Sequence, residues 1–192
     1  MMYAPAATLR LRDDLAAVVT SRHPWIYRNH LPAHGLQGGE LVRVEVGSEV
    51  AFGLFEATGA IGLRVLTWDE APSEAWWRAQ VRAAVGLRAP LAAAAHTAYR
   101  LIFGERDGLP GLIADRYGRF VVLEPHAASL EPYLPLVART LAQELRLKGV
   151  VRRFDHELEV LWGEAPPPEE TIVEHGLRFL VNLREGQKTG LF

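Results

Sequence analysis

One short segment combines side chains that can bind both the phosphates and the bases of a nucleic acid. Residues 22–28 read Arg-His-Pro-Trp-Ile-Tyr-Arg. Arginine binds phosphate through its charge and paired hydrogen bonds, and aromatic rings stack on unpaired bases, as in proteins that recognise single-stranded RNA. Arg22, His23, Trp25 and Arg28 are therefore the candidate RNA-binding residues. In the alternative interpretation, Trp25 and the isoleucine after it pack in a core and the arginines are solvated.

Other groups of polar residues give weaker signals. Residues 104–111 contain three glycines, but their spacing matches neither a dinucleotide-binding fingerprint nor a P-loop, and a tight β connection is the alternative. His30 and His34 lie in a Pro/Gly-rich stretch where no helix face is assured, so we expect no metal site. No catalytic acid/base pair is assigned among the aspartates of the middle region, Asp107, Asp115 and Asp155. Modest basic spots occur at Arg116 with Arg119 and at Arg152 with Arg153.

The composition excludes several functional classes. Cysteine is absent, which excludes disulfides, thiolate metal sites and cysteine nucleophiles in this chain. The net charge is −2 and the pI is about 6.4, so a strongly basic footprint for nucleic acid is missing and RNA contacts would have to come from local clusters. No signal peptide and no apolar run of membrane-spanning length is recognised, so we expect a soluble cytoplasmic protein with no membrane partner.

The first part of the chain is predicted to be mostly β. Period-2 alternation and glycine turns predict strands over residues 8–12, 40–46, 50–57 and 61–68. A short helix capped by Asp13 or Asp14 and an extended piece over 22–27 complete this unit, which ends at Pro72. Several short, closely spaced strands are typical of a small barrel.

The second part alternates strands and helices. Ser73 is predicted to cap a helix that runs to about Leu87, and Ser129 to cap an amphipathic helix over residues 130–147. Strands are predicted over residues 99–103, 112–116, 119–124, 150–154 and 157–162. A triple proline then leads to a hairpin around Gly176.

Four stretches together resemble the N-terminal half of the ribosomal RNA large-subunit methyltransferase I family, PUA domain-containing enzymes that modify cytosine C5 with S-adenosylmethionine. They are Arg22-His23-Pro24-Trp25, residues 99–118, Glu174-His175-Gly176 and Gly186-Gln187-Lys188-Thr189-Gly190. The resemblance implies an α+β fold with a PUA-like RNA-binding β-barrel (1–72) and a mixed α/β central domain (73–170). Residues 171–192 would be the first β-hairpin of a Rossmann-like methyltransferase domain that is missing from this chain.

By this resemblance, the chain is the RNA-recognition portion of an S-adenosylmethionine-dependent 23S rRNA (cytosine-5) methyltransferase. The resemblance implies large-subunit ribosomal RNA as the partner, S-adenosylmethionine as the cofactor of the full-length protein, and an RNA or phosphate contact for Lys188 near the active cleft. Without a cysteine to activate the cytosine ring and without a glycine-rich cofactor-binding turn, we expect the chain alone to be inactive.

Two other functions stay open, a stand-alone RNA-binding adapter and a protein-interaction module that binds no RNA. The second predicts no salt-dependent RNA binding. Leu191 and Phe192 would leave an exposed apolar edge in the shortened chain, which favours a homodimer.

Overall fold

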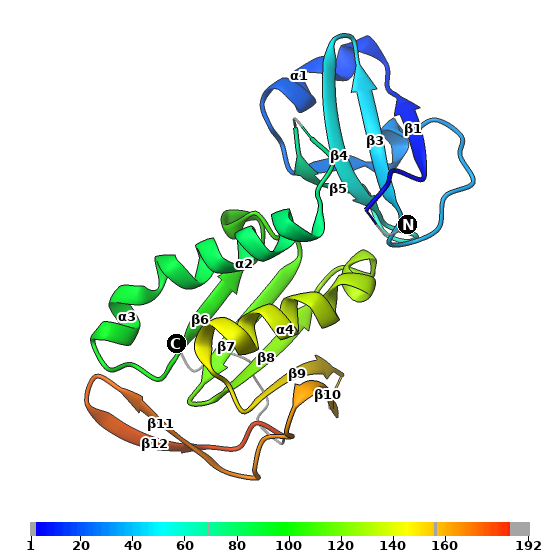
Figure 1. The fold of residues 1–192 in the computed structure, drawn as a ribbon. Helices are drawn as coiled ribbons and strands as arrows, with labels where there is room; N and C mark the ends of the chain where they lie inside the picture. The colour runs from blue at the N-terminus through cyan, green and yellow to red at the C-terminus, as the bar shows by residue number, and fades with distance from the viewer. Residues whose placement is uncertain (1–2, 69, 156, 185–192) are drawn as a thin grey trace. The chain divides into compact units, whose positions relative to one another are not determined.

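The chain folds into two compact units. The computed structural model describes residues 3–68, 70–155 and 157–184 (Figure 1). Unit 1 comprises Met1–Trp76 together with Ala127–Pro132, and unit 2 comprises Trp77–His126 together with Tyr133–Phe192. A short segment from the middle of the sequence therefore belongs to the N-terminal unit.

Unit 1 is built around a five-stranded sheet with the strand order β1-β3-β4-β5-β2. The strands are β1 (Ala7–Arg10), β2 (Trp25–Tyr27), β3 (Leu41–Val46), β4 (Glu49–Phe55) and β5 (Ile61–Thr67). β1 pairs with β3 in parallel and the other pairs are antiparallel. Its N-terminal part also contains the 3-10 helix η1 (Asp13–Leu15), α1 (Ala16–Thr20) and the 3-10 helix η2 (Arg28–His30).

The alternation of β3 builds the core of unit 1. Val42, Val44 and Val46 are each at most 1% exposed, and they pack in one cluster with Ile26 and Leu63. Burying each such side chain stabilises the folded unit by roughly 1.5–3 kcal/mol. The apolar positions that predict the strand therefore also stabilise the core.

The predicted aspartate cap is wrong, because α1 begins at Ala16, after the η1 turn, and has no side-chain cap bond.

One glycine is required where β4 meets β5. The ladder between these strands shifts register between Phe52 and Gly53. A Cβ atom on Gly53 would lie 2.6 Å from the carbonyl oxygen of Arg64, closer than a side chain tolerates. The bulge therefore depends on a residue without a side chain.

Unit 2 contains a second five-stranded sheet with the order β10-β9-β8-β7-β6. The strands are β6 (Ala98–Phe103), β7 (Leu112–Tyr117), β8 (Phe120–Pro125), β9 (Gly149–Phe154) and β10 (Glu157–Gly163). The helices are α2 (Glu74–Leu87), α3 (Ala89–Ala93) and α4 (Leu134–Leu145), with the 3-10 helix η3 (Gly104–Asp107). The 3-10 helix η4 (Ala128–Tyr133), which precedes α4, belongs to unit 1 except for its last residue. β8 and β9 are parallel because α4 carries the chain between them, and the other neighbours are antiparallel.

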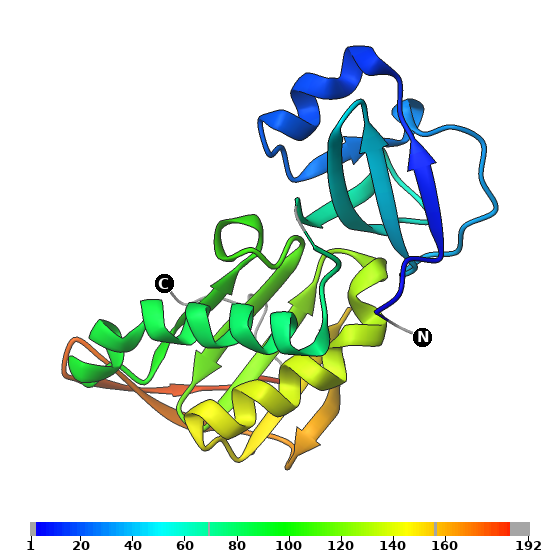
Figure 2. The same ribbon diagram turned by 45° about the horizontal axis from the view of Figure 1, so that its top comes forward.

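Helices cover one face of this sheet and a hairpin covers the other. Figure 2 shows α2 and α4 on one side and the hairpin of β11 (Glu170–Glu174) and β12 (Leu177–Val181) on the opposite side. Ile172 and Val181 of the hairpin pack with Tyr117 and Phe120 of the sheet. The predicted turn is confirmed, since His175 and Gly176 have φ values of 48° and 78°, as a two-residue type I′ turn requires.

The two predicted helix caps have different outcomes. The Ser73 cap is confirmed, because its Oγ accepts a hydrogen bond of 3.2 Å from the Trp76 backbone N–H. The Ser129 cap is wrong. Pro132 supports only a 3-10 turn at that point, so α4 begins at Leu134, and the Ser129 hydroxyl instead donates to the Glu56 carboxylate at 2.7 Å within unit 1.

Candidate nucleic-acid interface

Strand β2 lies at the edge of the unit 1 sheet and carries the predicted RNA-binding segment. It pairs with β5, and among the described residues no other strand pairs with it. Ile26 is 1% exposed and packs in the core, whereas Trp25 is half-buried and Tyr27 is 42% exposed. The alternative of core packing therefore holds for Ile26 but only partly for Trp25, because neighbouring residues of a strand point to opposite faces.

Arg22 and His23 lie just before this strand in the chain, and both are exposed. The Arg22 guanidinium lies 5.9 Å from the centre of the Trp68 ring and, within the part of the chain that is described, has no acidic partner. The His23 ring meets Trp25 edge-on at 5.8 Å, and its Nδ1 lies 3.1 Å from the Trp25 backbone N–H. The structure therefore brings Arg22, His23 and Trp25 together with an aromatic partner that the sequence did not indicate.

Arg28 has a different environment from the other three residues. Its guanidinium donates to the carbonyl oxygens of Gly59 at 2.7 Å, Glu56 at 2.7 Å and Ile61 at 3.3 Å. It also lies 5.6 Å from the centre of the Phe55 ring. Three backbone carbonyls occupy the guanidinium N–H donors that could otherwise bind a phosphate. Arg28 therefore stabilises the β4–β5 turn within unit 1. Its assignment to RNA binding stays a prediction that this geometry does not favour.

The remaining sequence-based candidates separate in space. His30 packs against Tyr27 at 6.2 Å and His34 against Phe55 at 4.6 Å, so the two imidazoles contact different rings. Among the described residues no group of three or more histidines and acids is placed to hold a metal ion. Lys188, Leu191 and Phe192 lie outside the described residues.

The glycine-containing segment 104–111 of unit 2 is fixed by an ion pair. The Asp107 carboxylate, only 4% exposed, accepts two hydrogen bonds from Arg88, at 2.8 and 2.6 Å. It also accepts the Phe103 backbone N–H at 2.6 Å. This aspartate therefore shapes the connection between β6 and β7, and no local sequence signal indicates its partner 19 residues earlier.

A second ion pair crosses the β6–β7 ladder. Arg100 donates to both carboxylate oxygens of Asp115, at 2.9 and 3.0 Å, and Asp115 is 1% exposed. The hydrogen bond with Asp115 is the main cause that raises the pKa of Arg100 above its ordinary value. The other basic spots also have internal contacts, since Arg116 donates to the Tyr99 hydroxyl and Arg153 to the Leu183 carbonyl.

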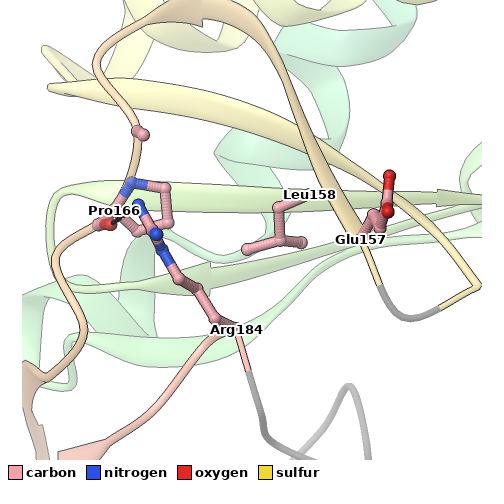
Figure 3. A pocket seen from close by; sticks show the side chains of 5 residues that line it. Glu157, Leu158, Pro166 and Arg184 are labelled. Carbon is pink, nitrogen blue, oxygen red and sulfur yellow. Dashed lines mark hydrogen bonds between the residues drawn. The ribbon is translucent and has the colours of Figure 1, made fainter.

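Unit 2 also holds a small pocket beside the start of β10. Its volume is about 330 Å³, and it is lined by Glu157, Leu158, Ala165, Pro166 and Arg184 (Figure 3). The Arg184 guanidinium points toward Pro166 and donates to its carbonyl oxygen at 3.4 Å. One carboxylate, one guanidinium and an apolar floor do not form a catalytic constellation.

The described residues do not fit S-adenosylmethionine. In α/β folds a nucleotide-type cofactor binds where a glycine-rich turn joins a strand to the following helix. The parallel crossover of unit 2, β8–α4–β9, has no glycine between Pro125 and Gly149, and a 3-10 helix containing Pro132 precedes α4.

No helix in the described part of the chain is long and apolar enough to cross a membrane.

Comparison with known proteins gives matches over both units. The family model described as "PUA-like domain" matches residues 9–68. A Deinococcus radiodurans protein named "Ribosomal RNA large subunit methyltransferase" is 34% identical over 219 aligned positions, covering 100% of this chain and 54% of that protein. An Erwinia tasmaniensis "Ribosomal RNA large subunit methyltransferase I" is 32% identical, covering 89% of this chain and 48% of that protein.

Two solved structures share the fold. A candidate SAM-dependent methyltransferase from Streptococcus mutans superposes with a TM-score of 0.81 at 17% identity, covering 97% of this chain and 51% of that one. A candidate methyltransferase in complex with SAH superposes with a TM-score of 0.82 at 17% identity. The chain spans about half the length of the curated relatives it matches. The resemblance inferred from the four sequence motifs is confirmed, as is a PUA-like domain in unit 1.

Proposed function

We propose that this chain is the RNA-recognition portion of an enzyme that methylates large-subunit ribosomal RNA, because relatives named ribosomal RNA large subunit methyltransferase match 89–100% of it. The observation that carries the proposal is the match of the whole chain, at 34% identity, to about half of a protein with that name. The PUA-like match over residues 9–68 supports the proposal that unit 1 is the part that binds RNA.

The geometry of unit 1 supports this role. Arg22, His23 and Trp25 gather at an exposed sheet edge, where a cation and aromatic rings lie side by side. This pairing suits RNA because phosphates need a cation and unpaired bases need a flat apolar surface. We further propose residues 1–72 as the RNA-binding domain, residues 73–170 as a central domain, and residues 171–192 as the beginning of a methyltransferase domain.

The methyl donor of the full-length protein is proposed to be S-adenosylmethionine, and the target atom C5 of a cytosine. C5 of cytosine is a weak nucleophile, and an enzyme usually activates it by adding a cysteine thiolate to the ring. This chain contains no cysteine, and its described residues do not fit the cofactor. We therefore place the cofactor site and the catalytic groups in the part of the relatives that this chain does not match.

Methyl transfer by the full-length protein tests the proposal. The protein would be incubated with methyl-labelled S-adenosylmethionine and separately with large-subunit and small-subunit rRNA, and the modified nucleoside identified by mass spectrometry. We expect 5-methylcytidine in large-subunit rRNA. Label only in small-subunit rRNA, or no label, would overturn the proposed function, and a label at another atom would overturn the C5 assignment.

RNA binding by the 192-residue chain is the second part of the test. Filter binding of large-subunit rRNA across salt concentrations should show a log–log slope of about −0.7 for each single-stranded phosphate that is neutralised. Salt-dependent binding without methylation by the full-length protein would favour the RNA-binding adapter. Absence of binding would favour the protein-interaction module.

A further inference from the structure

The edge strand of unit 1 presents one aromatic ring that the sequence pattern did not single out. Tyr27 is 42% exposed, more than Trp25, and its hydroxyl makes no hydrogen bond within the described residues. Because Ile26 between them points into the core, Tyr27 and Trp25 both lie on the outer side of β2. Two strand residues separate their Cα atoms by about 6.6 Å.

An imidazole supports each of these two rings. His23 meets Trp25 at 5.8 Å with an interplanar angle of 77°, and His30 meets Tyr27 at 6.2 Å with an angle of 89°. T-shaped contacts of this kind restrict the orientation of an exposed ring. A ring that is already oriented loses less conformational entropy when a ligand stacks on it. We call the surface formed by Arg22, His23, Trp25, Tyr27 and His30 the β2 ridge.

The positive charge of the β2 ridge is concentrated at one end. The exposed Arg22 has no acidic partner among the described residues, whereas three backbone carbonyls hold Arg28 beyond the other end of the strand. From Arg22 to Tyr27 an extended chain spans at most about 17 Å. The β2 ridge therefore has room for at most about five stacked nucleotides at 3.4 Å each.

We propose that the β2 ridge binds an unpaired RNA segment, with Tyr27 as a stacking platform for a base, Trp25 as a second platform and Arg22 as the phosphate contact. The ligand must be unpaired, because the faces of bases inside a duplex are covered by their neighbours in the stack. This inference rests on the proposed function. It adds the class of RNA that is bound, an unpaired segment, and the residue on which a base stacks, Tyr27.

Binding of short RNA to the full 192-residue chain tests the β2 ridge. The probes are a labelled oligouridine of eight nucleotides and an RNA duplex of the same length, followed by fluorescence anisotropy. Tyr27→Ala should weaken oligouridine binding by roughly 5- to 150-fold, the range for loss of one stacked base, and leave the salt slope unchanged. Tyr27→Phe should bind within twofold of the wild type, because the ring remains. Arg22→Ala should reduce the slope by about 0.7.

Two further variants separate stacking from loss of structure. Phe154→Ala removes a ring that is 60% exposed in unit 2 and should leave binding unchanged. Tyr27→Leu keeps apolar bulk without a π face, and should weaken binding like the alanine variant while circular dichroism and melting stay as in the wild type. Unchanged binding by Tyr27→Ala, or tighter binding of the duplex than of oligouridine, would overturn the β2 ridge. Methylation of large-subunit rRNA alongside either result would leave the proposed function standing.

Discussion

Arg28 is predicted from the sequence to bind RNA, but in the structure its guanidinium bonds to backbone carbonyls of unit 1. We expect Arg28→Ala to destabilise unit 1 strongly while leaving the intrinsic RNA affinity nearly unchanged. Its guanidinium makes two hydrogen bonds of 2.7 Å, to Gly59 and Glu56, and a weaker one of 3.3 Å to Ile61. Hydrogen bonds from charged groups contribute about 1.5–3 kcal/mol each.

Arg28 is half-buried, so water can replace part of these bonds in the variant. Taking the lower limit for the two short bonds gives a loss of about 3 kcal/mol in the free energy of unfolding. For a domain of this size, such a loss lowers Tm by about 12–24 °C. Arg28→Lys should recover about 1 kcal/mol, because a single ammonium group cannot reach three carbonyls in the fork geometry of a guanidinium.

Urea denaturation followed by tryptophan fluorescence measures this loss, since Trp25 and Trp68 both belong to unit 1. RNA binding is measured in parallel at a temperature where the variant is folded. The reasoning would be refuted by an Arg28→Ala variant as stable as the wild type. It would also be refuted by a folded variant whose salt slope falls by about 0.7, the signature of a lost phosphate contact.

Two further predictions concern the ion pairs of unit 2. Asp107→Asn should lower the free energy of unfolding by about 3 kcal/mol, because Arg88 and the Phe103 N–H lose a nearly buried carboxylate; urea denaturation measures this, and a loss below 1 kcal/mol would contradict it. The pKa of Arg100 is raised in the folded protein, so its contribution to stability is fully present below the ordinary pKa of an arginine and is lost only at more alkaline pH. The stability difference between the wild type and Arg100→Met should therefore stay constant from pH 7 to pH 10, and a decrease across that range would show that the pair with Asp115 does not behave as described.

Local sequence signals predicted many of the elements. The alternation in β3 predicted a strand within one residue of Leu41–Val46, and Ser73 predicted the start of α2. The His175-Gly176 turn predicted the terminal hairpin. These signals succeed because a strand face, a helix cap and a type I′ turn each depend on residues within a few positions of one another.

Residues with distant partners could not be assigned in this way. Ser129 has the residue type of a helix cap, but its hydroxyl bonds to Glu56, 73 positions away. Asp107 has the sequence context of a turn residue, but its carboxylate is held by Arg88, which lies between α2 and α3. Ser129 bonds to this distant carboxylate and caps no helix, whereas Asp107 combines a local bond from the Phe103 backbone N–H with the distant ion pair. Neither distant partner is visible from the neighbouring residues of the sequence.

The sequence by itself determined the family resemblance, the two-part organisation into a β-rich and an α/β region, and the segment that carries the RNA-binding candidates. Only the tertiary structure decided which side chains of that segment are available. Arg22 and Arg28 are the same residue type six positions apart, yet one is exposed beside Trp68 and the other is enclosed by the carbonyls of the β4–β5 turn. The physical reason is that the availability of a guanidinium for phosphate depends on the acceptors around it, and here those acceptors come from a turn about 30 residues further along the chain.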